Sequence, residues 1–199
     1  GSICGYGANG FYVGPQSAGA SPGPASYGAG GPLTITDVNL LLGRMDPDLF
    51  GIPSNVDAAR QAAERVIQDV EVDRRAKLSK ESMLQGLLDI ANERMADTIR
   101  GISVREGYDP KDYALTAFGG AGGQHACRIA EILGIQRILF PAEAGLLSAF
   151  GLRHARMERF AEHEVLQTWD ALKPRFAELM RSIEQQALNA LMTEGFGLG

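Results

Sequence analysis

The stretch that decides the fold is YALTAFGGAGG at residues 113–123, followed by QHACRIAEILG at residues 124–134. A short apolar run, residues 113–118, stops at four glycines within five residues. Apolar side chains then recur at helical spacing until Gly134 (Ala126, Ile129, Ala130 and Leu133). This pattern predicts a strand, a tight glycine turn and a helix, in that order.

The glycine turn predicts an anion site, because the first N–H groups of a helix have no partner within the helix and carry the positive end of its dipole. Glycines let a phosphate approach that backbone closely. The alternative interpretation is a turn that only packs the helix onto its strand. A dinucleotide fingerprint starting at Gly120 would need glycine where His125 stands, and a P-loop would need lysine where Gln124 follows the last glycine.

Composition narrows the function classes. The 199 residues fit one domain or slightly more, and 45% hydrophobic residues are enough for a core. A net charge of −5 argues against nucleic acid or an acidic membrane surface as a partner. We find neither an apolar run of membrane-spanning length nor a signal peptide pattern. Two distant cysteines and three histidines without ligand spacing predict a reduced, cytoplasmic protein with no certain metal site.

The rest of the chain predicts helices alternating with short strands. We expect strands and tight loops in the glycine- and proline-rich start, then a strand at 32–37 and a short helix capped by Asp37. Amphipathic helices are expected at 56–70, 80–102 and 169–194, a strand at 137–140, a buried helix at 143–154 and a strand at 159–168.

This order predicts an α/β fold with a largely parallel sheet and flanking helices, in which ligands bind beyond the carboxyl ends of the strands. We expect three segments. Residues 1–54 form glycine- and proline-rich loops with short strands, residues 55–155 form an α/β nucleotide-binding core around the glycine turn, and residues 156–199 form a final strand and helix.

Three motifs carry a family resemblance: FGGAGGQHA at 118–126, AGLLSAFGL at 144–152, and VGPQSAGASPGPASYGAGGPLTITDVNLLLGR at 13–44. Together they resemble the hydantoinase A / 5-oxoprolinase family, which includes N-methylhydantoinase A-type subunits and is related to acetone and acetophenone carboxylase subunits. The resemblance implies an actin-like ATPase fold, shared with sugar kinases and chaperones, in which two domains clamp ATP. This chain then corresponds to a C-terminal fragment, the second-half domain with a mixed sheet, without the first domain and its phosphate-binding motif.

The resemblance also implies roles for particular residues. Nucleotide binding falls to the turn and the helix start (Gly119, Gly120, Ala121, Gly122 and Gln124). His125 and Asp37 are candidate catalytic residues, with helix capping as the alternative for both. Ser17, Asn39 and Ser148 are candidate substrate contacts, and close helix packing is the alternative for Ser148. ATP and Mg²⁺ are the implied cofactors.

Three functions follow as expectations. The first is an ATP-dependent hydrolase that opens a cyclic amide, a hydantoin or 5-oxoproline, through a phosphorylated carbonyl. The second is a ketone carboxylase acting through an enol phosphate, and the third is a nucleotide-binding module without catalysis. The resemblance implies an N-terminal domain, a hydantoinase B-type subunit and an oligomer as partners, so the isolated chain is expected to be inactive.

The chain departs from the family pattern at three positions. Gly123 stands where the family usually has proline, and Ser21 and Ser26 stand where it often has aspartate and cysteine. A thiol role at Ser26 is therefore unavailable, and the exact substrate does not follow from the motifs.

Overall fold

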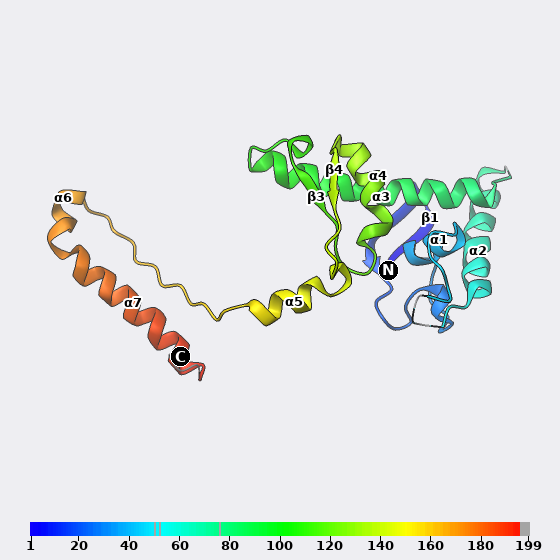
Figure 1. Ribbon diagram of the computed structural model, residues 1–199. Coiled ribbons are helices and arrows are strands. Elements are labelled where there is room, and N and C mark those ends of the chain that lie inside the picture. Colours follow the sequence, from blue (N-terminus) through cyan, green and yellow to red (C-terminus); the bar gives the residue numbers. More distant parts are fainter. Residues whose placement is uncertain (50, 52, 76, 196–199) are drawn as a thin grey trace. The chain divides into compact units, whose positions relative to one another are not determined.

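The computed structural model describes residues 1–49, 51, 53–75 and 77–195 (Figure 1). The chain divides into two compact units, Gly1–Leu147 and Ser148–Gly199, and each is described by itself. The predicted segments 1–54 and 55–155 do not separate in this way. Their side chains share one hydrophobic core, so the main division falls at Leu147.

The first unit begins with an antiparallel hairpin of β1 (Ser2–Gly7) and β2 (Gly10–Ser17), as the sequence predicts. The predicted strand at 32–37 is wrong, because only an isolated bridge joins Thr34 to Ile3 and helix α1 (Ile35–Leu41) begins directly afterwards. The backbone N–H and the hydroxyl of Thr34 both donate to the Asp37 carboxylate, and the helix begins three residues earlier than predicted. Asp37 therefore occupies the first turn of the helix and is not its N-cap.

Two long helices confirm the apolar periodicity, α2 (Val56–Arg74) and α3 (Lys80–Arg105). Their starts are fixed by Asn55 and Ser79, whose side chains accept hydrogen bonds from backbone N–H groups three residues on. Figure 1 shows α3 running through the unit, and it contacts α1, α2, β2 and α4. The first core lies on its N-terminal half and joins the hairpin, α1 and α2 (Cys4, Val13, Leu33, Val38, Ala63, Met83, Leu84, Leu87 and Leu88 among others).

The decisive stretch forms the predicted strand, turn and helix: β3 (Ala114–Thr116), the glycine turn and α4 (Gly122–Leu133). Gly134 ends α4 in the left-handed region at φ 70°, as its position after the last apolar residue predicts. β4 (Arg137–Leu139) pairs in parallel with β3, with Leu115 opposite Ile138. A second core joins α4 to the C-terminal half of α3 (Ala96, Ile129, Ala130, Leu133 and Ile135).

The fold class is therefore α/β, but the sheet differs from the prediction. Within the described residues the four strands form two separate two-stranded sheets, one antiparallel (β1–β2) and one parallel (β3–β4), and not one larger mixed or parallel sheet. Each of β3 and β4 has three residues, because the helical turn of η2 (Pro110–Asp112) occupies the approach to β3 and Pro141 follows β4 closely.

The remaining elements are η1 (Ala25–Tyr27), η3 (Ala144–Leu146), α5 (Leu147–His154), α6 (Trp169–Leu172), η4 (Lys173–Arg175) and α7 (Phe176–Thr193). The helix predicted at 143–154 forms as η3 and α5, but its predicted burial is wrong, since none of its residues is buried. The strand predicted at 159–168 is also wrong, since the described segment 155–168 contains no strand. The final helix is confirmed, with Pro174 in a helical turn that proline tolerates. Its apolar side is at most half-buried, because a unit of this size offers little surface to pack against.

Candidate functional site

The glycine turn lies at the carboxyl end of β3 and is exposed. Gly119 has φ 83°, a conformation that favours glycine, and its N–H donates to the Ala144 carbonyl at 2.7 Å. The N–H of Gln124 donates to the Ala121 carbonyl at 3.1 Å. Two of the five predicted nucleotide-binding residues thus have their backbone N–H groups engaged.

The middle of the turn is open. In the part of the chain that the structure describes, no hydrogen bond uses the N–H groups of Gly120, Ala121 or Gly122. A Cβ added at Gly120 would meet nothing within 4 Å. The donors available to an anion are therefore those of residues 120–122, at the start of α4.

An open cavity of about 570 Å³ adjoins this helix start. Its mostly apolar walls come from both predicted segments, 1–54 and 55–155. The elements that contribute are β1, β2, α1, α3 and α4. The lining residues are Gly1, Ser2, Val13, Gly14, Pro15, Ile35, Thr36, Ala91, Arg94, Met95, Ala121, Gly122, His125 and Ile129. An apolar pocket with a few polar groups is the usual form of a small-molecule site.

His125 is the buried polar side chain of this wall, with 6% of its surface exposed. Its Nδ1 lies 2.8 Å from Oδ1 of Asn92 on α3, and its Nε2 lies 3.4 Å from Nδ2 of Asn39 on α1. His125 therefore joins three helices in one polar cluster, Asn39–His125–Asn92. Asn39 Oδ1 is buried and has no hydrogen-bond partner among the described residues.

Two effects lower the pKa of His125 below its usual value. Burial is the larger, because it disfavours the charged imidazolium, and the positive charge of Arg44 adds to it. Arg44 is fixed nearby, since its Nη2 donates to the Gln124 carbonyl at 2.6 Å. His125 is therefore a neutral imidazole at pH 7, able to accept a hydrogen bond or a proton at Nε2.

Asp37 has a different environment from the one its predicted catalytic role requires. It is 0% exposed, and its carboxylate accepts hydrogen bonds from the N–H groups of Ala25, Ser26 and Thr34 and from the Thr34 hydroxyl, at 2.8–3.1 Å. These four bonds use the acceptor capacity of a carboxylate. These bonds tie the glycine-rich loop onto α1, which favours the structural alternative for Asp37 over the catalytic one.

Neither serine candidate is part of this cluster in the unit to which it belongs. Ser17 is the exposed last residue of β2, its Oγ accepts from the Gly19 N–H at 3.2 Å, and it is not among the described lining residues of the cavity. Ser148 is exposed on α5 and belongs to the second unit. Of the two substrate candidates in the first unit, Ser17 and Asn39, only Asn39 contacts His125.

Asn92 is the residue that the sequence analysis missed. It lies within α3, one residue after Ala91 of the first core and four before Ala96 of the second. Its spacing from Leu88 places it on the buried stripe of the helix. A lone amide on an otherwise apolar stripe is the signal that points to it.

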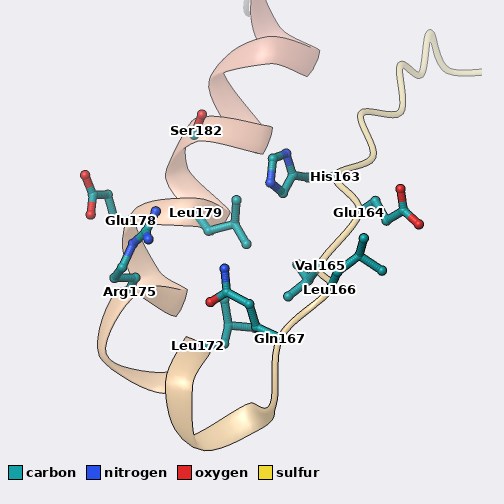
Figure 2. A pocket seen from close by; sticks show the side chains of 10 residues that line it. All are labelled: His163, Glu164, Val165, Leu166, Gln167, Leu172, Arg175, Glu178, Leu179 and Ser182. Carbon is teal, nitrogen blue, oxygen red and sulfur yellow. The ribbon is translucent and has the colours of Figure 1, made fainter.

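The second unit has a pocket of its own, of about 300 Å³. Figure 2 shows His163 and Val165 of the extended segment on the side of Leu179 and Ser182 of α7, whereas the Glu164 side chain points away from that helix. An ion pair between Arg159 and Glu194 links the same segment to the end of α7. This pocket contains none of the predicted site residues.

The described residues contain neither a metal-binding cluster nor a membrane-spanning helix. No group of three or more His, Cys, Asp and Glu side chains there is arranged to hold a metal ion. No helix in the same residues is long and apolar enough to cross a membrane.

Comparison with known proteins identifies the family. Residues 1–160 match the Hydantoinase/oxoprolinase family model, so the chain belongs to the hydantoinase/oxoprolinase family. This confirms the resemblance carried by the three motifs.

Individual proteins agree with this assignment. The chain is 44% identical to 5-oxoprolinase PfmaA of Pestalotiopsis fici over 154 residues, which cover 73% of this chain and 12% of that protein. Among solved structures, nucleotide-free acetone carboxylase matches 99% of this chain with a TM-score of 0.73 and 25% identity. The ATP-dependent caprolactamase of Pseudomonas jessenii matches 100% with a TM-score of 0.69 and 30% identity. The chain spans 29% of each of those two structures.

Proposed function

We propose that this chain is part of a longer ATP-dependent enzyme that hydrolyses a cyclic amide through a phosphorylated carbonyl. The observation that carries the proposal is the open glycine turn, which starts α4 beside the cavity and His125 in a chain of this family. The names of relatives support it, since they include a 5-oxoprolinase and an ATP-dependent caprolactamase.

In this proposal, the N–H groups of Gly120, Ala121 and Gly122 bind a phosphate of ATP, and Mg²⁺ is carried by the phosphates. The chain is the second-half domain of an actin-like ATPase. The domain that completes the nucleotide site lies outside this sequence, as does a hydantoinase B-type subunit or domain. The complete protein is an oligomer of the cytoplasm.

The proposed reaction uses ATP to activate a stable bond. The terminal phosphoryl group moves to the amide oxygen, ADP leaves, and the amide carbon becomes electrophilic enough for water to attack. The ring C–N bond then breaks, and a second water releases phosphate from the acyl phosphate. Such a transfer depends mostly on positioning and on hydrogen-bond donors, and His125 Nε2 is suited to accept a proton from water.

A second candidate is an ATP-dependent ketone carboxylase, in which phosphorylation traps the enol form of a ketone. The match to acetone carboxylase favours it as strongly as the caprolactamase match favours hydrolysis. A nucleotide-binding module without catalysis is the third. The described residues do not separate these three, because the cavity and the glycine turn suit all of them.

Titration calorimetry and product analysis separate the candidates. The complete polypeptide is titrated with ATP–Mg²⁺ and then incubated with hydantoin, 5-oxoproline, caprolactam, or acetone with bicarbonate. We expect ATP binding and ring opening by the complete polypeptide, and no turnover by the 199-residue chain. Carboxylation of acetone without ring opening of any cyclic amide would favour the ketone carboxylase. ATP binding without turnover of any substrate would favour the nucleotide-binding module.

The variant Gly120→Val tests the nucleotide site directly. A β-branched side chain at the open middle of the turn should block the approach of phosphate and weaken ATP binding by at least about tenfold. Because a Cβ meets no neighbour at this position, the fold should be unaffected. The matched control is Gly101→Val on α3, where a Cβ also meets nothing within 4 Å. Unchanged ATP affinity in Gly120→Val would contradict the assignment of the turn.

A further inference from the structure

We infer that Asn92 is a positioning residue, which holds His125 in the Nδ1-protonated form with its Nε2 lone pair free to act in the reaction. The inference rests on the function proposed above, but its first test does not require activity. It assigns a role to a residue that no motif of the sequence marks.

Because Asn92 is buried, its amide group would cost free energy if it only filled space in the core. Its side chain is 1% exposed, between the two hydrophobic cores that α3 joins. A buried amide costs free energy unless it is hydrogen-bonded, whereas an apolar side chain of similar volume would simply continue the stripe. The amide contributes something a leucine cannot, a directed acceptor 2.8 Å from Nδ1 of His125.

That acceptor fixes the tautomer of the imidazole. Because Oδ1 of Asn92 accepts, Nδ1 must carry the proton, and Nε2 is left as the nitrogen with a lone pair. A carboxylate in the same place would also orient the ring, but its negative charge would favour the imidazolium. A neutral amide orients the ring and leaves it neutral.

The charged groups around the ring agree with a neutral imidazole. Arg44, which follows α1, is fixed on the carbonyl of Gln124. Arg94 on α3 lines the same cavity and donates to the Val13 carbonyl. The nearest carboxylate on α1 is Asp37, whose oxygens are occupied by four hydrogen bonds. The surroundings of His125 therefore include two cations and no free anion among these groups.

The other side of the ring is incomplete. Asn39 Nδ2 lies 3.4 Å from Nε2, which is long for a hydrogen bond, and Asn39 Oδ1 has no partner among the described residues. Both atoms, Nε2 with its one long contact and Oδ1 with none, are acceptors. The group that completes the cluster is thus a hydrogen-bond donor, either a water molecule or the N–H of a cyclic amide.

Nitrogen-15 NMR of histidine-labelled protein tests the tautomer. The chain has three histidines, so the His125 signal is identified by its loss in His125→Gln. We expect the Nδ1–H form in the unchanged protein, and loss of that preference in Asn92→Leu. In Asn92→Asp the same tautomer should persist, with the pKa of His125 higher by at least about one unit. An Nε2–H signal in the unchanged protein would overturn the inference.

Kinetics of the complete polypeptide test the positioning role. Asn92→Leu should lower kcat by about 10- to 100-fold with little change in KM. Asn92→Asp should recover much of this loss and move the acid limb of the pH–rate profile to higher pH. If Asn92→Leu does not fold, Asn92→Asp still decides, because an unchanged profile would refute the role. A protein that turns over no substrate overturns the proposed function, whereas the NMR spectra still decide the tautomer.

Discussion

Helix α1 carries two buried polar side chains, Asp37 and Asn39, and their surroundings differ in one decisive respect. Asp37 accepts four hydrogen bonds from the loop and the helix start, so its acceptor capacity is filled. Asn39 makes one long contact to His125 and leaves Oδ1 without a partner among the described residues. Both are at most 1% exposed, so burial alone does not distinguish them.

The difference teaches how to separate structural from functional polar groups in this chain. A buried group with all its hydrogen bonds made within the protein stabilises the fold and has nothing left for a ligand. A buried group with an unmade bond, next to a cavity, is incomplete without another molecule. By this criterion the Asp37 cluster has a structural environment, and the Asn39–His125–Asn92 cluster is the one that fits the proposed site.

The largest effect is expected at Asp37. Asp37→Ala leaves the buried N–H groups of Ser26 and Thr34 and the Thr34 hydroxyl without their acceptor, at about 1–3 kcal/mol each, whereas the Ala25 N–H keeps the Pro32 carbonyl at 3.1 Å. We therefore expect the free energy of unfolding to fall by about 3–5 kcal/mol, measured by urea denaturation. Asp37→Asn, which keeps one acceptor oxygen, should lose about half as much. A loss below about 1 kcal/mol in Asp37→Ala would remove the contrast with Asn39.

His125 is expected to show the opposite behaviour, with a small change in the free energy of unfolding and a large loss of activity. His125→Gln keeps a polar side chain that can donate to Asn92, so the free energy of unfolding should change by about 1 kcal/mol or less. Activity of the complete polypeptide should fall about 100-fold or more, because the acceptor at Nε2 is lost. Turnover assays and denaturation curves on the same preparations check both values. If His125→Gln lost as much stability as Asp37→Ala but kept its activity, the role of His125 would be structural and not catalytic.

A smaller effect distinguishes two neighbouring glycines of the turn. Gly119→Ala places a side chain at φ 83° and should destabilise the chain by about 1–2 kcal/mol. Gly120→Ala has no positive φ and no neighbour within 4 Å of the added Cβ, so it should be neutral to within about 0.5 kcal/mol. Thermal denaturation of the two variants side by side measures the difference. Equal losses would mean that the turn is strained at both positions.

The smallest effect is a pH dependence of stability. The pKa of His125 is lower in the folded chain than its usual 6.5, so the unfolded chain binds more protons in the interval between the two values. The contribution of neutral His125 is complete above pH 6.5 and is lost as pH falls through that interval. Urea denaturation between pH 5 and 8 should show this slope, and His125→Gln should lack it. Arg44→Gln should raise the pKa of His125 in the folded chain by removing a positive charge, and so should narrow the pH interval between the folded and unfolded pKa values.

The local sequence pattern was sufficient to predict the long helices and the glycine turn. The apolar spacing predicted α2, α3, α4 and the final helix, and the glycines predicted the turn after β3. The same pattern was not sufficient to predict short segments in which helix and strand are both favoured locally. Residues 32–37 have β-branched side chains, yet the carboxylate of Asp37 satisfies the N-terminal groups of a helix there.

Sequence by itself determined the main helices, the glycine turn and the family, and it offered His125 and Asn39 as candidates, because periodicity, glycine positions and motifs are properties of the chain. Only the tertiary structure showed that Asp37 accepts four hydrogen bonds, that Asn92 contacts His125 and that Ser17 lies outside the cavity lining. Contacts across 86 residues, as between Asn39 and His125, depend on how α1, α3 and α4 pack. That packing is set by burial of many side chains together, which no single motif records.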